Sequence, residues 1–328
     1  MDQGESPRKV LVLGGAGFIG RSAVRALLDA DCEVIVGSRH AAPPARTEAW
    51  LRACEWRQLR VERHLHPTDW ERPLTDVDAV INCVGILRER RGESYERVHH
   101  LGPAALATAA KRAGRRLIQV SALGLHEPLR SGFLRSKAAG EQAIIAAGGD
   151  WCIVRPSLLD AEHGGFGARW IRRVARWPLH PLPSAACGRI AALDVRDLGE
   201  ALAQLALRHE LPGQSREFEL GGFEALSLGE LMASLRTLHT QAPARRLPVP
   251  NWLARLGSHV LDLMHLTPFS FGHWELLQRD NLPQPNRIEE VLGRSPRRVG
   301  VPRLIPAADE VSILRAEGPA PSQPATNR

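Results

Sequence analysis

The feature that most constrains the fold is a glycine-rich segment, GGAGFIG, at positions 14–20. It follows a short apolar run over residues 9–13 and precedes a stretch with helical patterning. Glycine permits a tight turn from strand to helix, and a backbone without Cβ atoms lets a diphosphate approach the helix N-terminus. In this context the segment predicts a dinucleotide-binding βαβ unit rather than a purely structural turn.

Strand and helix patterns alternate over the first half of the chain. The strand-length runs lack polar alternation, which is typical of a parallel sheet covered on both faces. The sequence therefore predicts an α/β fold with a doubly wound parallel sheet. We expect strands over residues 9–13, 33–37, 59–62, 79–84, 117–120 and 151–155, and helices over 17–30, 94–113 and 131–147.

The amino-acid composition changes after Pro156. Proline and glycine are frequent from 164 to 188, where we expect a loop on the substrate side. The boundaries that follow are 8–156 for a dinucleotide-binding domain, 157–315 for a smaller mixed α/β lobe partly interleaved with the first sheet, and 316–328 for a disordered tail. Later helices are predicted over 197–208 (opened by a capping box from Asp197 to Glu200), 227–238, 251–263 and 272–279.

The charge and the cysteine content limit the kinds of binding partner that the chain can have. The net charge is +7, almost all of the positive charge is arginine, and the arginines are spread without an aromatic platform, which argues against nucleic acid. A solvated basic surface and an anionic lipid or acidic partner both remain open. Five cysteines without a CxxC pair predict reduced thiols and no metal site. We expect a cytoplasmic chain, with a peripheral position at the inner membrane as an alternative.

The end of the second predicted strand bears on the choice of cofactor. An NAD site favours Asp or Glu there, to bond the ribose 2′-hydroxyl. This chain has Ser38 and Arg39 instead, a small hydroxyl and a cation that suit a 2′-phosphate. The residues favour NADP(H) over NAD(H), although Arg39 could also be an ordinary surface arginine.

Several motifs together resemble the short-chain dehydrogenase/reductase superfamily, whose fold is a Rossmann sheet with a small C-terminal lobe. They are the glycine segment, Asn82-Cys83-Val84-Gly85, Ser121-Ala122, Lys137 and Arg155-Pro156-Ser157. Residues 84–87, 136–141, 220–222 and 275–281 are similar to the atypical group around the nucleotide-binding accessory subunit of respiratory complex I, within the epimerase/dehydratase-like branch. The resemblance covers roughly residues 8 to 305.

The resemblance implies roles for individual residues. Lys137 is expected to bond the nicotinamide ribose, and Ser121 to hold a substrate carbonyl. The cofactor-binding residues expected from the motifs are Gly14, Gly17, Phe18, Ile19, Gly20, Ser38, Arg39, Cys83, Val84, Gly85, Lys137, Pro156 and Ser157.

The proton donor of the superfamily is missing. The tyrosine expected four residues before Lys137 is Phe133, which has no ionisable group and cannot act as a general acid. The residues that could replace this acid are the single tyrosine, Tyr95, and the histidines His99, His126 and His163.

His64 bears on the cofactor instead. It stands where relatives have an aspartate that contacts adenine.

Two hypotheses follow. In the first, the protein is a cofactor-bound scaffold, sensor or assembly factor that docks on a membrane-bound respiratory or quinone-related complex. The apolar stretch 252–276 motivates this partner, although the stretch could equally pack on its own sheet. In the second, the protein is an active NAD(P)H-dependent oxidoreductase or epimerase that acts on a hydrophobic substrate with an acid other than tyrosine.

Overall fold

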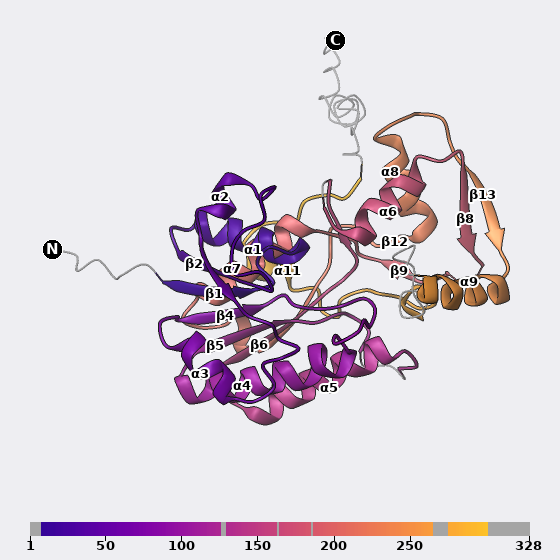
Figure 1. The fold of residues 1–328 in the computed structure, drawn as a ribbon. Coiled ribbons are helices and arrows are strands. Elements are labelled where there is room, and N and C mark those ends of the chain that lie inside the picture. The colour runs from indigo at the N-terminus through magenta and orange to yellow at the C-terminus, as the bar shows by residue number, and fades with distance from the viewer. Residues whose placement is uncertain (1–7, 126–128, 163, 185, 265–274, 301–328) are drawn as a thin grey trace, which may run out of the picture.

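A seven-stranded, wholly parallel sheet forms the centre of the molecule, in the order β11-β6-β5-β4-β1-β2-β3 (Figure 1). The computed structural model describes residues 8–125, 129–162, 164–184, 186–264 and 275–300. This order is that of a doubly wound Rossmann sheet with an added strand. The strands are β1 (Lys9–Leu13), β2 (Glu33–Ser38), β3 (Glu55–Gln58), β4 (Ala79–Asn82), β5 (Arg116–Val120), β6 (Trp151–Pro156) and β11 (Glu217–Leu220).

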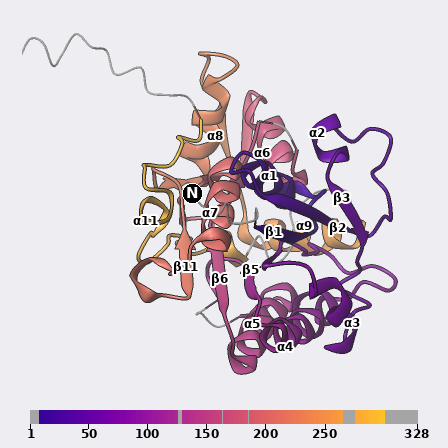
Figure 2. The same cartoon turned by 90° about the vertical axis from the view of Figure 1, so that its left-hand side faces the viewer.

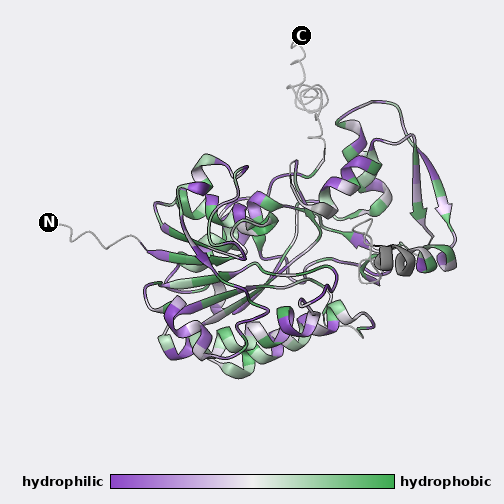
Figure 3. Ribbon diagram, in the orientation of Figure 1, coloured by the Kyte–Doolittle hydropathy of each residue, from purple (hydrophilic) through white to green (hydrophobic). Residues whose placement is uncertain are grey.

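Helices cover both faces of the sheet (Figures 1 and 2). One face carries α1 (Phe18–Leu28), α7 (Val195–Leu207) and α11 (Ile288–Leu292), with α2 (Ala49–Arg52) beside α1. The other carries α3 (Thr68–Glu71), η1 (Arg72–Leu74), α4 (Gly102–Ala113) and α5 (Gly132–Ala147). Because both faces are covered, buried apolar residues follow one another along the strands, as in β1, and Figure 3 colours the ribbon by the hydropathy of each residue.

The second lobe lies beyond the carboxyl ends of these strands. Its helices are α6 (Phe166–Ala175), α8 (Leu228–Thr237) and α9 (Asn251–Met264), and β8 (Leu179–Pro183) pairs in parallel with β13 (Arg245–Val249). Two short ladders join it to the sheet: β7 (Leu159–Asp160) with β10 (Leu193–Asp194), and β9 (Arg189–Ile190) with β12 (Leu226–Ser227). Ser227 and Glu230 form the capping box that opens α8. A short η3 (Pro212–Gln214) precedes β11.

The two halves of the chain are interleaved. The last sheet strand, β11, pairs with β6, and α7 packs against α1. The prediction that Asp197 opens this helix is wrong, because α7 begins at Val195 and Asp194 is its N-cap. Asp197 is fully buried and instead binds Arg294 and Arg297, which anchor the later chain to α7.

Two other predicted elements differ from the structure. The third strand is β3 rather than residues 59–62, because the buried Leu59 and Val61 of that segment lie outside the sheet and form part of a cavity wall. The predicted helix over 94–113 has two parts: it starts as a π-helical turn, η2 (Glu96–Leu101), and continues as α4. Gly114 ends α4 in the left-handed region, at φ +64°.

Some predictions fall on residues that are not described. The tail beyond residue 315 lies outside the described residues, as do residues 272–274 of the predicted helix 272–279, of which residues 275–277 are helical. Within the described part of the chain, no helix has both the length and the apolar character needed to cross a bilayer.

Candidate functional site

The glycine segment forms the turn from β1 into α1. Gly14 has a φ of +72°, and the Gly17 amide donates to the Gly14 carbonyl oxygen over 2.7 Å. A Cβ on Gly20 would lie 2.2 Å from that same oxygen, so only glycine lets α1 pack this closely under the loop. Gly17 is the N-cap, and the first turn of α1 has neither a side-chain cap nor an acidic residue. Its free amides therefore suit an anion, and the loop fits a dinucleotide pyrophosphate.

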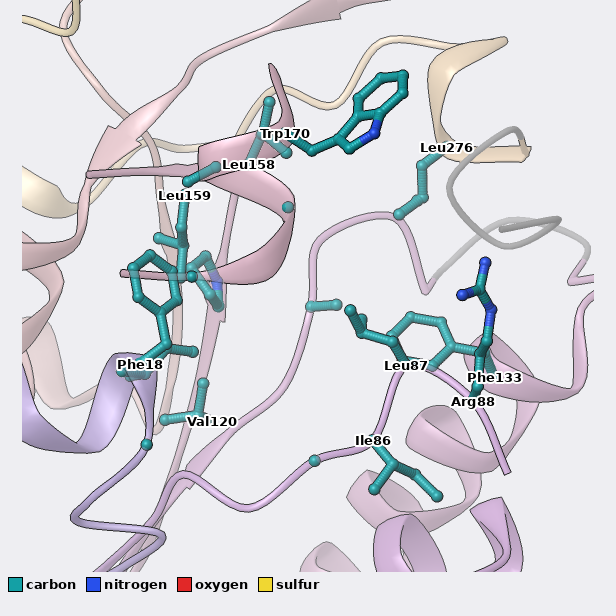
Figure 4. A pocket seen from close by; sticks show the side chains of 18 of the residues that line it. Phe18, Ile86, Leu87, Arg88, Val120, Phe133, Leu158, Leu159, Trp170 and Leu276 are labelled. Atoms are coloured by element: carbon teal, nitrogen blue, oxygen red, sulfur yellow. The ribbon is translucent and has the colours of Figure 1, made fainter. Parts of the chain in front are cut away.

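A continuous cavity of about 1410 Å³ extends from this loop along the carboxyl ends of the strands into the second lobe. Figure 4 shows apolar side chains that face it from different elements, among them Phe18 of α1, Phe133 of α5 and Trp170 of α6. All of the expected cofactor and catalytic residues lie on its wall except Gly20, which lies beneath the loop. Those on the wall are Gly14, Gly17, Phe18, Ile19, Ser38, Arg39, Cys83, Val84, Gly85, Ser121, Phe133, Lys137, Pro156 and Ser157.

The end of β2 lies at one end of this cavity. Ser38 is buried, and its hydroxyl accepts a hydrogen bond from the His40 amide over 3.2 Å. Arg39 is exposed, and its guanidinium pairs with the Glu93 carboxylate over 2.6 Å. A ligand phosphate at this position would therefore meet a cation that already has a carboxylate partner.

His64, which replaces the aspartate that relatives use to contact adenine, does not reach the cavity wall next to β2. This ring packs on Trp70, with 5.0 Å between the centroids, and its Nδ1 bonds the Arg60 carbonyl oxygen, so it is not on the cavity wall. A buried carboxylate on this wall is Glu62, beside Val61, and Glu93 also lines the cavity. Sequence reasoning missed Glu62 because it placed this residue at the end of a predicted strand rather than on a cavity wall.

The turn after β4 is held by side-chain hydrogen bonds. The Asn82 Oδ1 accepts from the Val84 amide over 3.1 Å, and its Nδ2 donates to Gln119 on β5 over 2.9 Å. A Cβ on Gly14 would lie 3.2 Å from Val84, so this turn and the glycine loop are in close contact. Burial raises the pKa of Cys83 to about 12, which leaves an unreactive thiol on the wall.

The polar groups below the second lobe are Ser121 and Lys137. The Ser121 Oγ is buried and has no hydrogen-bond partner among the described residues. The Lys137 ammonium lies 5.6 Å from the centroid of the ring of Phe133, the residue found where the resemblance led us to expect a tyrosine. Burial lowers the pKa of Lys137 to about 8, and the charge of Glu141 partly offsets this effect. Both groups can interact with a polar atom of a ligand.

His99 is not suited to replace the missing acid. The Ser136 hydroxyl donates to the Phe133 carbonyl oxygen, so the His99 Nδ1 must donate to Ser136, over 2.9 Å. Its Nε2 then accepts from the Ile86 amide over 3.1 Å. Burial, together with the charge of Lys137, lowers the pKa of His99 to about 2, so it stays neutral.

Tyr95 is also held by contacts within the protein. Its hydroxyl donates to the Leu87 carbonyl oxygen over 2.8 Å, and its ring packs on His99 and edge-on to Phe133. It does not lie on the cavity wall. The two remaining histidine alternatives, His126 and His163, lie outside the described residues.

The C-terminal part of the chain returns to support this wall. The Ser157 hydroxyl at the end of β6 bonds the Asn281 Oδ1 over 2.9 Å. The buried Glu275 carboxylate accepts from the Arg130 and Ser131 amides, over 2.8 and 2.9 Å, at the N-terminus of α5. This interaction fixes the start of the helix that carries Phe133 and Lys137.

Comparisons with known proteins agree with this geometry. A family model described as NAD(P)H-binding matches residues 14–172. The chain is 33% identical over 202 residues to a ceramide reductase of Caulobacter vibrioides, a match that covers 59% of each protein. It is 28% identical over 277 residues to the mitochondrial NADH dehydrogenase (ubiquinone) 1 alpha subcomplex subunit 9 of Arabidopsis thaliana, which covers 83% of this chain and 68% of that subunit.

Solved structures share the fold. The UDP-glucose 4-epimerase of Thermus thermophilus, in complex with NAD, superposes with a TM-score of 0.55 at 18% identity, over 74% of this chain and 86% of that one. The likeness supports the Rossmann-type α/β architecture. The NAD(P)H-binding family match supports a nicotinamide dinucleotide as the ligand, and the residues at the end of β2 bear on the choice between NADP and NAD.

Proposed function

Because the chain belongs to the short-chain dehydrogenase/reductase superfamily, in its atypical branch, we propose that it is an NADP(H)-dependent reductase of a lipid-like carbonyl compound. One observation carries the proposal: the Ser121 hydroxyl, which has no hydrogen-bond partner in the described part of the chain, and the Lys137 ammonium share the wall of a large, mostly apolar cavity. A buried hydroxyl without a partner costs free energy unless a ligand satisfies it.

The residues divide the chemistry between them. The Ser121 hydroxyl donates a hydrogen bond to the substrate carbonyl oxygen. The Lys137 ammonium, with its pKa lowered to about 8, supplies the proton that Phe133 cannot. When bound, the nicotinamide supplies the hydride. The apolar wall accommodates long alkyl chains, and a relative named ceramide reductase supports a lipid substrate.

The test measures oxidation of NADPH by a long-chain ketone, with a short water-soluble ketone for comparison. Ser121→Ala and Lys137→Met should each lower kcat/KM by at least about 100-fold. The exposed Ser184→Ala serves as the matched control and should keep the wild-type value. Wild-type kcat/KM in both site variants would refute these roles.

The residue at 133 distinguishes this proposal from a second one. Phe133→Tyr places a phenol beside Lys137, and general acid catalysis contributes about 10²–10⁴-fold, so the rate should rise in a pocket that binds the ketone. The second candidate is a cofactor-bound accessory subunit without turnover, which Phe133 itself and the relationship to a subunit of NADH dehydrogenase favour. NADPH that stays bound and reduced with every ketone, in wild type and in Phe133→Tyr, would favour the accessory role.

NADP(H) preference rests on Arg39 and Ser38. Arg39→Ala should weaken NADPH binding about tenfold and leave NADH binding unchanged, because only NADPH has the 2′-phosphate. Glu93→Gln should strengthen NADPH binding, since it releases the Arg39 guanidinium from its carboxylate partner. The exposed Arg112→Ala is the matched control. Equal loss of both dinucleotides in Arg39→Ala would contradict the preference.

A further inference from the structure

The second lobe exposes large apolar side chains along β8, β13 and α9. Trp252 is 68% exposed, Leu256 53% and Leu247 51%. Monomeric soluble proteins rarely expose so many large apolar groups together unless the surface binds something. We call this set the apolar patch, and its members are Trp177, Leu179, Leu247, Trp252, Leu253 and Leu256.

The apolar patch is continuous with the cavity through the β8–β13 ribbon. Paired residues of a parallel ladder point to the same face, and pairing joins Pro181 to Leu247 and Pro183 to Val249. Leu247 on this face is exposed, whereas Pro181, Pro183 and Val249 line the cavity. The opposite face packs on α6 and α8 through Leu182. One face of the ribbon thus leads from solvent to the cavity.

Helix α9 makes the same connection. At about 100° per residue, Trp252 and Leu256 share one side of the helix, and Ala254 and Gly257 lie on the side that lines the cavity. Leu253 falls between them, and it is both exposed and part of the cavity wall. The apolar side of α9 therefore extends from the exposed Trp252 through Leu253 to the cavity wall.

Arginine predominates around the apolar patch, although the exposed Glu230 of α8 lies near Arg246 of β13 and α9 includes Asp262. Residues 166–184 and 235–257 each contain four arginines and no Asp or Glu, although the whole chain has 36 acidic residues. Arg173, Arg176 and Arg245 are exposed, and Arg245 lies on the same ribbon face as Leu247. Exposed tryptophan and leucine beside arginine are typical of segments that lie in the interface of an anionic bilayer.

We propose that the apolar patch docks on the surface of an anionic phospholipid bilayer, and that the cavity opens toward that bilayer. Trp252 and Leu256 would enter the headgroup region, with the arginines of β13 against the lipid phosphates. A lipid-like ligand would then pass along α9 and β13 into the cavity without crossing water. The docking itself does not depend on the reductase reaction, so failure of either proposal leaves the other testable.

Vesicle sedimentation of the full chain tests the docking. Phosphatidylcholine vesicles with and without phosphatidylglycerol are compared, at low and at high salt. We expect binding only to the anionic vesicles, weakened by salt, and at least tenfold weaker in the double variant Trp252→Glu, Leu256→Glu. Arg245→Gln should weaken binding about fivefold, the effect of about one interfacial charge. Ile145→Glu, an exposed apolar residue of α5, is the matched control and should bind like wild type.

Other outcomes overturn the proposal. Absence of binding to anionic vesicles would do so, and a dimer in sedimentation velocity that Trp252→Glu dissolves would assign the apolar patch to a second copy of this chain. Equal loss of binding in Ile145→Glu would show that the surface of α9 has no special role. NADPH affinity, measured in the same samples, confirms that each variant is folded.

Discussion

Substitution of Gly20 by alanine should abolish tight dinucleotide binding while most of the fold persists. A Cβ at this position would lie 2.2 Å from the Gly14 carbonyl oxygen and 2.8 Å from the Gly15 Cα. Contact at normal separation requires the loop to move by about 1 Å, which takes a hydrogen bond of ordinary length beyond its useful range. The loss of one or two charge-assisted bonds to the pyrophosphate costs about 2–3 kcal/mol, or about 30- to 150-fold in Kd.

The assay is a titration of each variant with NADPH, followed by nicotinamide fluorescence. Gly17→Ala provides an intermediate step, because its Cβ would lie 3.0 Å from the same oxygen. Arg112→Ala on α4, an exposed residue that is not on the cavity wall, is the control. Circular dichroism confirms the secondary structure of each variant. A Gly20→Ala protein that binds NADPH within about threefold of wild type would refute the proposed role of the loop.

Three further predictions concern the elements behind the cavity. Arg155 donates hydrogen bonds to both carboxylate oxygens of the buried Glu141, so Arg155→Met should lower the free energy of unfolding in urea by about 3–5 kcal/mol. A loss below about 1 kcal/mol would contradict this. Glu275→Gln removes the charge at the start of α5 and should lower the free energy of unfolding by about 1–2 kcal/mol. An unchanged thermal transition would contradict this prediction. If Lys137 is the acid, the reduction rate should be constant below pH 8 and fall above it. The pKa of Lys137 is about 8 in the folded protein and 10.5 ordinarily, so the unfolded chain binds more protons between these two pH values. The free energy of unfolding should therefore rise with pH over this range. Lys137→Met should abolish both dependences, and a wild-type rate that is constant to about pH 9.5 would exclude Lys137 as the acid.

The sequence predicts the position of most of the sheet strands correctly, because the apolar runs and the turn residues that bound them coincide with the strands of the fold. The run over residues 9–13 and its glycine turn are found as β1 and the loop into α1. The third strand was misplaced because β3 is an edge strand with the pattern Glu-Trp-Arg-Gln, whose charged residues pair with their neighbours rather than pack in the core. Leu59 and Val61, which follow β3 in the chain, line the cavity instead.

Long-range interactions account for what the sequence could not predict. Asp197 has the pattern of a helix cap, yet its partners, Arg294 and Arg297, lie about a hundred residues later in the chain. The π-helical turn η2 places His99 against Ile86 and Ser136, a constraint that no local pattern shows. The Glu275 cap on α5 is likewise visible only once the chain has folded.

The composition of the cavity was only partly predictable. Motifs identified Ser121, Lys137 and Phe133, because each occupies a fixed place after a strand or on a helix. The unpartnered state of the Ser121 hydroxyl and the lowered pKa of Lys137 depend on which side chains surround them. The neutrality of His99 depends on the hydroxyl of Ser136, and the inclusion of Glu62 depends on the bend after β3.

Isothermal titration of the pure protein with NADPH and NADH tests the central claim most directly. The claim is that the loop after β1 holds the pyrophosphate and the end of β2 receives a 2′-phosphate. It predicts one site per chain, with NADPH bound about tenfold more tightly than NADH. Heat of binding from neither dinucleotide would contradict the assignment of the cavity, whatever the outcome of the activity assays.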